Sequence, residues 1–505
     1  MSPADDLRPA ASFDGGDLDC GNGLLLLIRK HIDPLSAGQL LEIFSRESSV
    51  AEDLPSWCRL TGNELVTHEQ SNRVHRFLVS RGPFAKHDEA SVTSVTRPEV
   101  RDAPATATPR NASVPPTVAP IPPLAVLGIG SWPRPAWMLR ALHERLCGRL
   151  EETEFQQTAD DAIRLAVAAQ ERAGVDLITD GEQRRDNYAS FVGALLENCQ
   201  LVPITDLLAY VDDPEHFAEE LRGLDVPADK VRHPAVFGRL ARKRSLALHE
   251  LQFVQSISRT PVKVALPGPY LLTRTMWLEC VSDRAYASRE ELAADIVKIL
   301  RAEAEALLQA GATLVQFDEP VLTEVVHGRT AGNRVFMCGA LGARRDTEEE
   351  LAFAEQLLSE TLSELPAERL ALHICRGNWT TDEGAALTGD YAPLMGLLAR
   401  VPVGAVLLEM CTPRAGDVAL LASLPQRLRI GVGVVNQKSP RIETLPEVLS
   451  RAERAIELFG ADRVLLHPDC GFATFADSPI AAADVAERKL AVVVQAARQL
   501  RESLR

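Results

Sequence analysis

The sequence lacks an excess of basic residues, because 54 lysines and arginines stand against 70 acids and give a net charge of −16 over 505 residues. Nucleic acid and anionic lipid bind through clustered positive charge, so we expect neither as a partner. Long hydrophobic runs are also missing, and the longest early run, Leu24 to Ile28, is too short to span a membrane. The first ten residues, MSPADDLRPA, carry acids where a signal peptide carries basic residues, which predicts a cytoplasmic protein.

Cysteine is scarce, with nine residues in the whole chain, and the number is odd. In a reducing compartment these residues are thiols rather than disulfides. Cysteines that lie in ordered motifs are therefore candidates for metal ligands or nucleophiles.

One stretch has the composition of a linker. Residues 98–123 hold eight of the 32 prolines and no aromatic residue, and residues 85–123 show no hydrophobic periodicity. Such a composition is typical of a semi-rigid spacer. We therefore predict a small domain at 1–83, a linker at 84–121 and a large domain at 122–505.

The small domain has the pattern of a two-layer α/β sandwich. Residues 24–32 and 53–62 are predicted helices, and 39–45 is a predicted strand. Residues 63–70 and 73–80 are predicted to form a hairpin.

The large domain alternates strands and helices. Eight apolar runs end in polar or glycine-rich turns, at 125–131, 175–181, 262–268, 313–319, 370–375, 405–410, 429–435 and 463–469. Helical periodicity separates most of them, which favours a (β/α)8 barrel with insertions at about 185–260 and 320–346. A doubly wound sheet is the alternative.

Four polar residues stand at the ends of predicted barrel strands, where a barrel places its active site. They are His373, Cys375, Glu409 and Cys470. Two thiolates, an imidazole and a carboxylate form a good ligand set for zinc. Cys411, two residues after Glu409, is an alternative ligand. A zinc ion with an exchangeable ligand can hold a substrate thiol as its thiolate, so the set points to chemistry on sulfur.

From Leu124 to its end, the chain resembles the catalytic domain of the cobalamin-independent methionine synthases. The resemblance rests on the H-x-C, strand-terminal Glu and P-D-C-G motifs, together with I-G-S, G-E and D-E-P segments. It implies zinc at the quartet above and homocysteine as substrate. It also implies a substrate carboxylate at Ile129, Gly130 and Ser131, and a substrate ammonium between Glu182 and Asp318. A structural alternative for Asp318 and Glu319 is helix or loop capping.

The chain departs from that family in two ways. It has no N-terminal second barrel, and residues 436–440 read N-Q-K-S-P where the family has D-I-H-S-P. Lys438 thus stands where the family has a histidine that protonates the leaving folate. We predict an anion-binding or catalytic role for Lys438 and leave the methyl or alkyl donor open. His467 stands at a position that does not ligate zinc in the family.

Residues 13–83 resemble the small TusA-like sulfur carriers. The carrier cysteine would be Cys20, which precedes a predicted helix whose dipole should favour the thiolate and lower its pKa. The family's Cys-Pro-x-Pro is Cys-Gly-Asn-Gly here. The resemblance implies a cysteine desulfurase or another sulfur donor as a partner, and a relic carrier domain is the alternative.

These features predict a zinc-dependent S-alkyltransferase or S-methyltransferase that acts on a thiol such as homocysteine. The alternative enzyme delivers persulfide sulfur from Cys20 to the zinc site and forms a new thiol. A non-catalytic zinc scaffold is less favoured, because a carboxylate ligand suits exchange better than a closed structural site.

Overall fold

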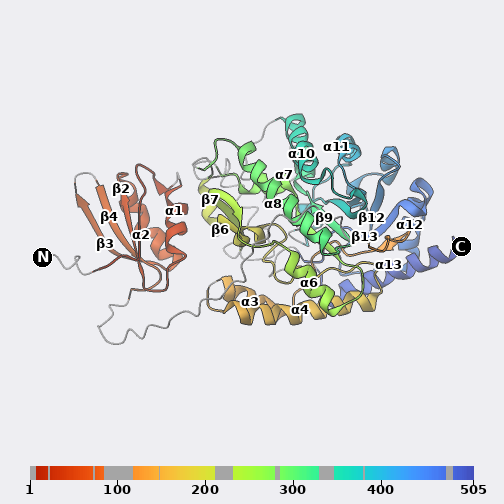
Figure 1. Ribbon diagram of the computed structural model, residues 1–505, viewed down its shortest axis with the longest axis horizontal. Helices are drawn as coiled ribbons and strands as arrows, with labels where there is room; N and C mark the ends of the chain where they lie inside the picture. The colour runs from red at the N-terminus through yellow and green to blue at the C-terminus, as the bar shows by residue number, and fades with distance from the viewer. Residues whose placement is uncertain are drawn as a thin grey trace.

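The computed structural model describes residues 7–20, 23–71, 74–84, 118–146, 148–210, 231–278, 282, 285–328, 346–378, 381–473 and 481–504. The predicted linker lies almost wholly outside these ranges, as do Cys147, Cys280 and Cys338. The small N-terminal domain and the barrel are separate bodies in Figure 1, with helix α1 on the side that faces the barrel. Within the described ranges, every helix is too short or too polar to cross a membrane.

The N-terminal domain is the predicted two-layer sandwich. Its four-stranded sheet has the order β1-β2-β4-β3, with β1 parallel to β2 and the other pairs antiparallel. The strands are β1 (Ala11–Asp14), β2 (Leu40–Ser45), β3 (Glu64–Ser71) and β4 (Val74–Ser80). Helices α1 (Leu24–Ile32) and α2 (Val50–Thr61) supply apolar side chains to one small core with the sheet.

The large domain is a closed barrel. Seven parallel strands run in the order β5-β13-β12-β11-β10-β9-β8. Isolated parallel bridges Leu127–Leu177 and Ile178–Val262 join β5 to β8 and close the ring at the predicted second strand. The strands are β5 (Ala125–Val126), β8 (Lys263–Pro267), β9 (Leu314–Asp318), β10 (Leu370–Ile374), β11 (Ala405–Leu408), β12 (Arg429–Val435) and β13 (Val464–Pro468).

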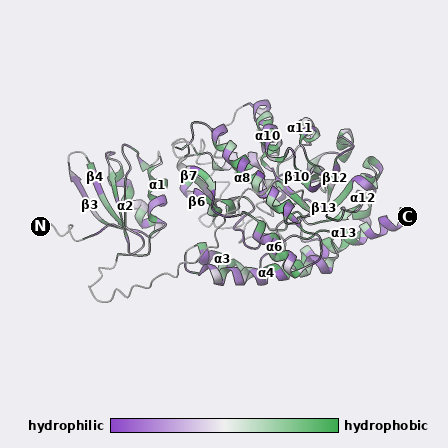
Figure 2. Ribbon diagram, viewed as in Figure 1, coloured by the Kyte–Doolittle hydropathy of each residue, from purple (hydrophilic) through white to green (hydrophobic). Residues whose placement is uncertain are grey.

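Amphipathic helices cover the barrel, and in Figure 2 they carry mixed hydrophobic and hydrophilic stripes. They are α3 (Ala136–Leu146), α4 (Glu152–Ala173), α6 (Leu248–Ile257), α7 (Pro269–Met276), α8 (Arg289–Gln309), α9 (Val321–His327), α10 (Thr347–Leu362), α11 (Met395–Arg400), α12 (Leu445–Phe459) and α13 (Ala483–Ser503). Short 3-10 turns lie at η6 (Ala367–Arg369), η7 (Glu383–Ala385), η8 (Ala392–Leu394), η9 (Pro413–Ala415), η10 (Val418–Ser423) and η11 (Ala461–Arg463).

Strand alternation sorts the side chains between two environments. On β9, Val315 and Phe317 join the large core beneath the helices, whereas Leu314 joins a separate apolar cluster inside the barrel. Gln316 and Asp318 share the inward face with Leu314. The barrel interior is therefore apolar at the start of the strands and polar at their carboxyl ends, where the site residues lie.

The first predicted insertion forms a hairpin that contacts the N-terminal domain. It contains η2 (Ser190–Leu195), β6 (Leu196–Pro203), η3 (Ile204–Tyr210) and β7 (Arg232–Arg242). Arg29 of α1 donates from Nε to Asp206 Oδ2 at 2.7 Å, and Gln200 of β6 donates to Asp33 at 3.0 Å. Lys30 lies 5.5 Å from the centre of the Phe237 ring. This polar interface holds α1 against the insertion (Figure 1).

Candidate metal centre and substrate pocket

A pocket opens at the carboxyl ends of the barrel strands. It brings together predicted site residues from both halves of the large domain: Ile129, Ser131, Glu182, Asp318, His373, Cys375 and Cys470. Its remaining wall is mostly supplied by the insertion, through residues 187–190, Ile204 and residues 231–234. The hairpin that touches the N-terminal domain therefore also lines the pocket.

His373, Cys375 and Cys470 form one cluster. Their ligand atoms lie within 4.8 Å of one another, and all three side chains are buried. The hydrogen bond from Cys470 lowers the pKa of Cys375, although burial acts in the opposite direction. The same bond, together with burial, raises the pKa of Cys470. Cys375 is thus favoured as a thiolate that accepts a hydrogen bond from the Cys470 thiol.

Asp318 orients the histidine of this cluster. His373 Nδ1 lies 2.8 Å from Asp318 Oδ1, so Nδ1 carries the proton that the carboxylate accepts. The Nε2 atom of His373 is buried and has no hydrogen-bond partner among the residues that the structure describes. A buried nitrogen left with a free lone pair beside two sulfurs is the arrangement that a metal ion satisfies.

This cluster fits zinc by its chemistry. Two sulfurs and one imidazole are soft and borderline ligands, and three protein ligands leave a position for an exchangeable fourth. The Asp318 carboxylate fixes the orientation of the His373 ring and increases the basicity of its other nitrogen.

Glu409 is close to the cluster but does not belong to it in this structure. Its Oε2 accepts from the backbone N–H of Arg376 at 2.9 Å, and its Oε1 accepts from Arg414 Nε at 3.0 Å. Ligation by Glu409 would require the carboxylate to leave at least one of these partners. Cys411 does not join the cluster either; burial raises the pKa of its thiol, and its backbone N–H donates to Asp469.

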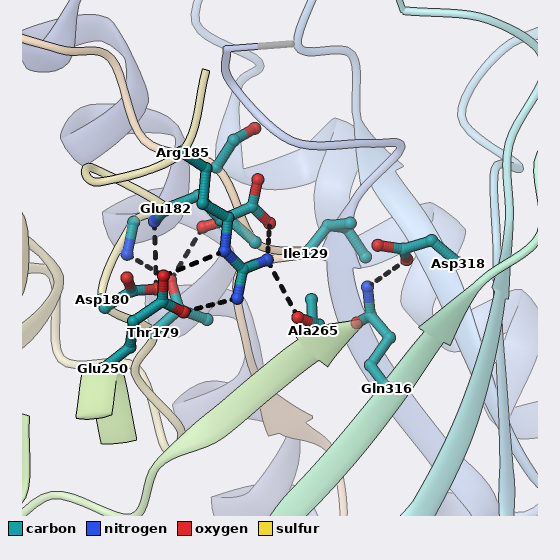
Figure 3. A network of polar contacts seen from close by, with 12 residues as sticks. Ile129, Thr179, Asp180, Glu182, Arg185, Glu250, Ala265, Gln316 and Asp318 are labelled. Atoms are coloured by element: carbon teal, nitrogen blue, oxygen red, sulfur yellow. Dashed lines mark hydrogen bonds and ion pairs between the residues drawn. The ribbon is translucent and has the colours of Figure 1, made fainter. Parts of the chain in front are cut away.

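Glu182 enters the pocket from a strained turn. Gly181 and Glu182 both have left-handed backbone, with φ of 72° and 55°, which is costly for a residue with a side chain. The Glu182 side chain presses against Gly130, where any Cβ would collide with the carboxylate. Burial raises the pKa of Glu182 to about 7, although nearby Arg185, 3.9 Å away, acts in the opposite direction. Figure 3 shows Arg185 between Glu182 and Glu250.

The I-G-S segment supplies Ile129 and Ser131 to the pocket lining. Ser131 is buried, and its Oγ accepts a hydrogen bond from the backbone N–H of Ala473 at 3.2 Å. Gly471 also approaches Ser131 closely, so this segment abuts the loop that carries Cys470.

The other predicted residues have separate positions. Glu319 accepts from the N–H groups of Tyr270 and Leu271, both at 2.8 Å, and therefore caps the start of α7, as the capping alternative predicts. Lys438 is buried outside the pocket lining; burial lowers its pKa, and Glu409 and Cys470 oppose that effect. His467 is buried inside the barrel and does not join the cluster.

The predicted lowering of the Cys20 pKa is wrong. Cys20 lies in the apolar core of the N-terminal domain, and burial, followed by the charges of Asp53 and Asp19, raises its pKa to about 12. The helix begins at Leu24, four residues later. Burial and two acids therefore outweigh any dipole effect at this thiol.

Sequence reasoning missed a group of buried polar residues beneath the pocket. Arg185 forms a bidentate pair with Glu250, at 2.6 and 3.2 Å, and Lys263 and Gln316 lie inside the barrel. A lysine and a glutamine in the middle of the apolar runs VKVALP and TLVQFD were the available signal.

Comparison with known proteins agrees with these features. Residues 124–499 match the family described as cobalamin-independent synthase, catalytic domain, and residues 23–81 match sulfurtransferase TusA, a match that begins after Cys20. A methionine synthase of Sulfurisphaera tokodaii is 25% identical over 393 residues, covering 76% of this chain and 95% of that protein. A methionine synthase of Thermococcus kodakarensis is 27% identical, covering 68% and 85%.

A solved structure gives the same fold. The B12-independent methionine synthase from Shewanella sp. W3-18-1, in complex with selenomethionine, has a TM-score of 0.57 and 23% identity. The similarity covers 76% of this chain and 99% of that one.

Proposed function

We propose that this chain, which belongs to the cobalamin-independent synthase catalytic-domain family, transfers a methyl or other alkyl group to the thiol of homocysteine or a similar amino acid. One observation carries the proposal: the same pocket holds a cluster of two sulfurs and an imidazole together with two buried carboxylates, Glu182 and Asp318. The cluster suits a substrate sulfur, and the carboxylates suit a substrate ammonium.

Zinc would be held by His373, Cys375 and Cys470, with Glu409 as a further candidate ligand. When bound, it supplies a Lewis acid that keeps a substrate thiol deprotonated at neutral pH. Asp318 keeps the His373 proton on Nδ1 and so leaves Nε2 available.

Pocket residues outside the metal cluster would orient the substrate amino acid. Glu182 and Asp318 would accept hydrogen bonds from the ammonium, which are stronger than neutral ones. The Ile129–Ser131 segment would receive the carboxylate. These contacts fix the sulfur relative to the cluster, so that binding energy is used for positioning.

The transfer step is a displacement at carbon. The substrate thiolate forms the new S–C bond while the leaving group departs with the electrons of the old bond and takes up a proton where its basicity requires one. Lys438 is proposed to act near that leaving group, because it is a buried cation close to Cys470.

The test is a product analysis. Zinc-loaded protein is incubated with homocysteine and methyl donors such as a methylated folate, a methylated corrinoid and a simple sulfonium. Mass spectrometry should detect methionine with at least one donor. No product with any donor, from protein that holds zinc, would contradict the proposal.

A second candidate is sulfur incorporation, and one contact favours it. The α1 helix of the TusA-like domain docks on the hairpin whose β7 strand lines the pocket. The terminal sulfur of a Cys20 persulfide would attack an acceptor carbon and expel its leaving group. An external thiol would then reduce the resulting mixed disulfide, releasing the new thiol and restoring Cys20.

This second candidate predicts different products. With a cysteine desulfurase, cysteine and a reducing thiol, the protein should carry labelled sulfur on Cys20 and pass it to an acceptor. The Cys20→Ala variant should lose both signals while retaining alkyl transfer. If no labelled sulfur is found on Cys20 of the wild-type protein, sulfur incorporation through Cys20 is excluded.

A further inference from the structure

One buried lysine beneath the pocket has no part in the function proposed above. Lys263, on β8, is 1% exposed and points into the barrel. Its Nζ donates to the backbone carbonyl of Ile129 and to the side-chain oxygen of Gln316. Burying an ammonium is unfavourable unless its hydrogen bonds are made, so these two bonds explain its stability there.

The lysine connects to the metal cluster through one side chain on the next strand. Gln316 is fully buried on β9, and its Nε2 donates to Asp318 Oδ1 at 2.6 Å (Figure 3). Asp318 in turn accepts from His373 Nδ1. The four residues thus form a continuous chain of hydrogen bonds across β8, β9 and β10.

The donors and acceptors in this series of four hydrogen-bonded residues have fixed positions. A protonated lysine can only donate, so Gln316 turns its oxygen towards Lys263 and its NH2 group towards Asp318. A flipped amide would place NH2 against ammonium and oxygen against carboxylate. Asp318 remains an acceptor, and His373 is therefore protonated on Nδ1 with Nε2 free for the cluster.

The same lysine also holds a second part of the pocket lining. Ile129 is the first residue of the segment proposed to receive the substrate carboxylate, and its carbonyl is one of the two Lys263 acceptors. Burial lowers the pKa of Lys263 to about 7, whereas Asp318, Glu182 and Cys470 favour its charged form. Two carboxylates and one cysteine of the site thus favour the charged form of Lys263.

We propose that Lys263 is a positioning residue that aligns both halves of the site: the His373 imidazole through Gln316 and Asp318, and the Ile129–Ser131 segment directly. This inference rests on the proposed function, since it concerns the alignment of the same cluster and pocket.

Two variants test it by different routes. Lys263→Met removes the cation and both of its bonds, whereas Gln316→Met keeps Lys263 and its bond to Ile129 and interrupts only the path to His373. Lys489→Met is the matched control, because Lys489 is equally buried but bonds Glu443 and the Arg441 carbonyl outside the cluster.

The first measurement needs neither zinc nor activity. Nitrogen-15 NMR of labelled histidine in the metal-free protein, assigned with His373→Gln, should show His373 protonated on Nδ1 in the wild type and in Lys489→Met. Lys263→Met and Gln316→Met should show a mixture of tautomers. An unchanged Nδ1–H tautomer in both variants would overturn the proposal.

The second measurement separates this inference from the proposed function. Chelator competition should show zinc affinity weaker by up to about 10-fold in both variants, because both side chains act on His373 only through Asp318, and loss of such a direct partner itself costs about 10- to 100-fold. Homocysteine binding relative to 2-mercaptoethanol should weaken further only in Lys263→Met. If both variants bind zinc as tightly as the wild type, the positioning role of Lys263 is refuted and the proposed function is not affected. If the zinc-loaded wild-type protein transfers no alkyl group, the proposed function is refuted and the positioning role is not. If Lys263→Met does not fold, Gln316→Met decides the tautomer and zinc predictions.

Discussion

Two pairs of buried cysteines in this chain differ in the charges around them. Cys375 and Cys470 lie with His373 at the carboxyl ends of the barrel strands, and the charges of Cys470 and of the buried Lys263 and Lys438 interact. Cys20 and Cys58 share an apolar core in the N-terminal domain, and burial raises the pKa of each to about 12.

The difference shows what makes a buried thiol chemically useful. Burial alone favours the neutral thiol, and the acids Asp19 and Asp53 strengthen that preference at Cys20. In the barrel, the hydrogen bond from Cys470 and the charge of His373 oppose burial at Cys375 and lower its pKa, whereas the same bond adds to burial at Cys470. Only the barrel pair is therefore prepared to bind a soft cation, whereas Cys20 must become more exposed before it can react.

The largest expected difference is in zinc content after each pair of cysteines is removed. The Cys375→Ser/Cys470→Ser variant should lose nearly all bound zinc, because hydroxyl is a poor zinc ligand. The Cys20→Ser/Cys58→Ser variant should keep about one zinc per chain. Zinc is measured by mass spectrometry of the dialysed protein. Full occupancy in the first variant, or loss in the second, would place the metal elsewhere.

The second prediction concerns thiol reactivity. A pKa of about 12 leaves very little thiolate at pH 8, so iodoacetamide should modify Cys20 on the order of 1,000-fold more slowly in the native protein than in urea. The native rate should keep rising with pH up to about 12, since the thiolate fraction grows until the folded-state pKa is reached. Peptide mass spectrometry follows the rate. A plateau near pH 9 would mean that the thiol is not protected.

Much of the architecture could be predicted from sequence, and the errors have one physical origin. Eight apolar runs and the H-x-C spacing identify the strands and place His373 and Cys375 on one face, because alternation is a local property. The pairing of Asp318 with His373 depends on the register between β9 and β10, where the two residues are direct partners. Register between parallel strands is set by the whole barrel and has no local signature.

The same limit applies to the contacts of Glu409 and to the pKa of Cys20, where the prediction is wrong. Arg414, the partner of Glu409, follows on a loop whose path the sequence does not determine. For Cys20, the local position before a helix predicted a lowered pKa, whereas its burial in one core with residues of α2 raises the pKa. Contacts between distant segments thus override local expectation in both regions.

The third prediction tests whether the barrel pair serves an amino-acid pocket. Glu182→Gln should weaken homocysteine binding by about 1–3 kcal/mol, the range for a hydrogen bond to a charged group, and leave 2-mercaptoethanol binding and zinc content unchanged. Because the Glu182 pKa is raised to about 7, wild-type affinity should increase from pH 6 to pH 8 as the carboxylate loses its proton. Calorimetry measures both effects. Equal losses for both thiols would argue against an ammonium contact.

The smallest expected effect concerns the contact between the two regions. Arg29 and Asp206 are each mostly buried at the interface and 2.7 Å apart, so their interaction should contribute about 1 kcal/mol to docking. In a double-mutant cycle, Arg29→Ala and Asp206→Ala should each lower the docked fraction, and the double variant should lower it little further. Arg488→Ala, which removes an exposed pair with Asp484, is the control.

Energy transfer between dyes at Leu60→Cys on α2 and Leu165→Cys on α4, both exposed positions, reports docking. Additive losses would show that the two side chains do not interact in solution.

The same variants also distinguish the two candidate functions. Alkyl transfer needs only the barrel and should survive undocking, whereas transfer of sulfur from Cys20 depends on the local concentration that the docked and tethered carrier provides. A selective loss of sulfur transfer in Arg29→Ala would make the interface part of the reaction cycle, and equal retention of both activities would leave the N-terminal pair outside the chemistry of the barrel.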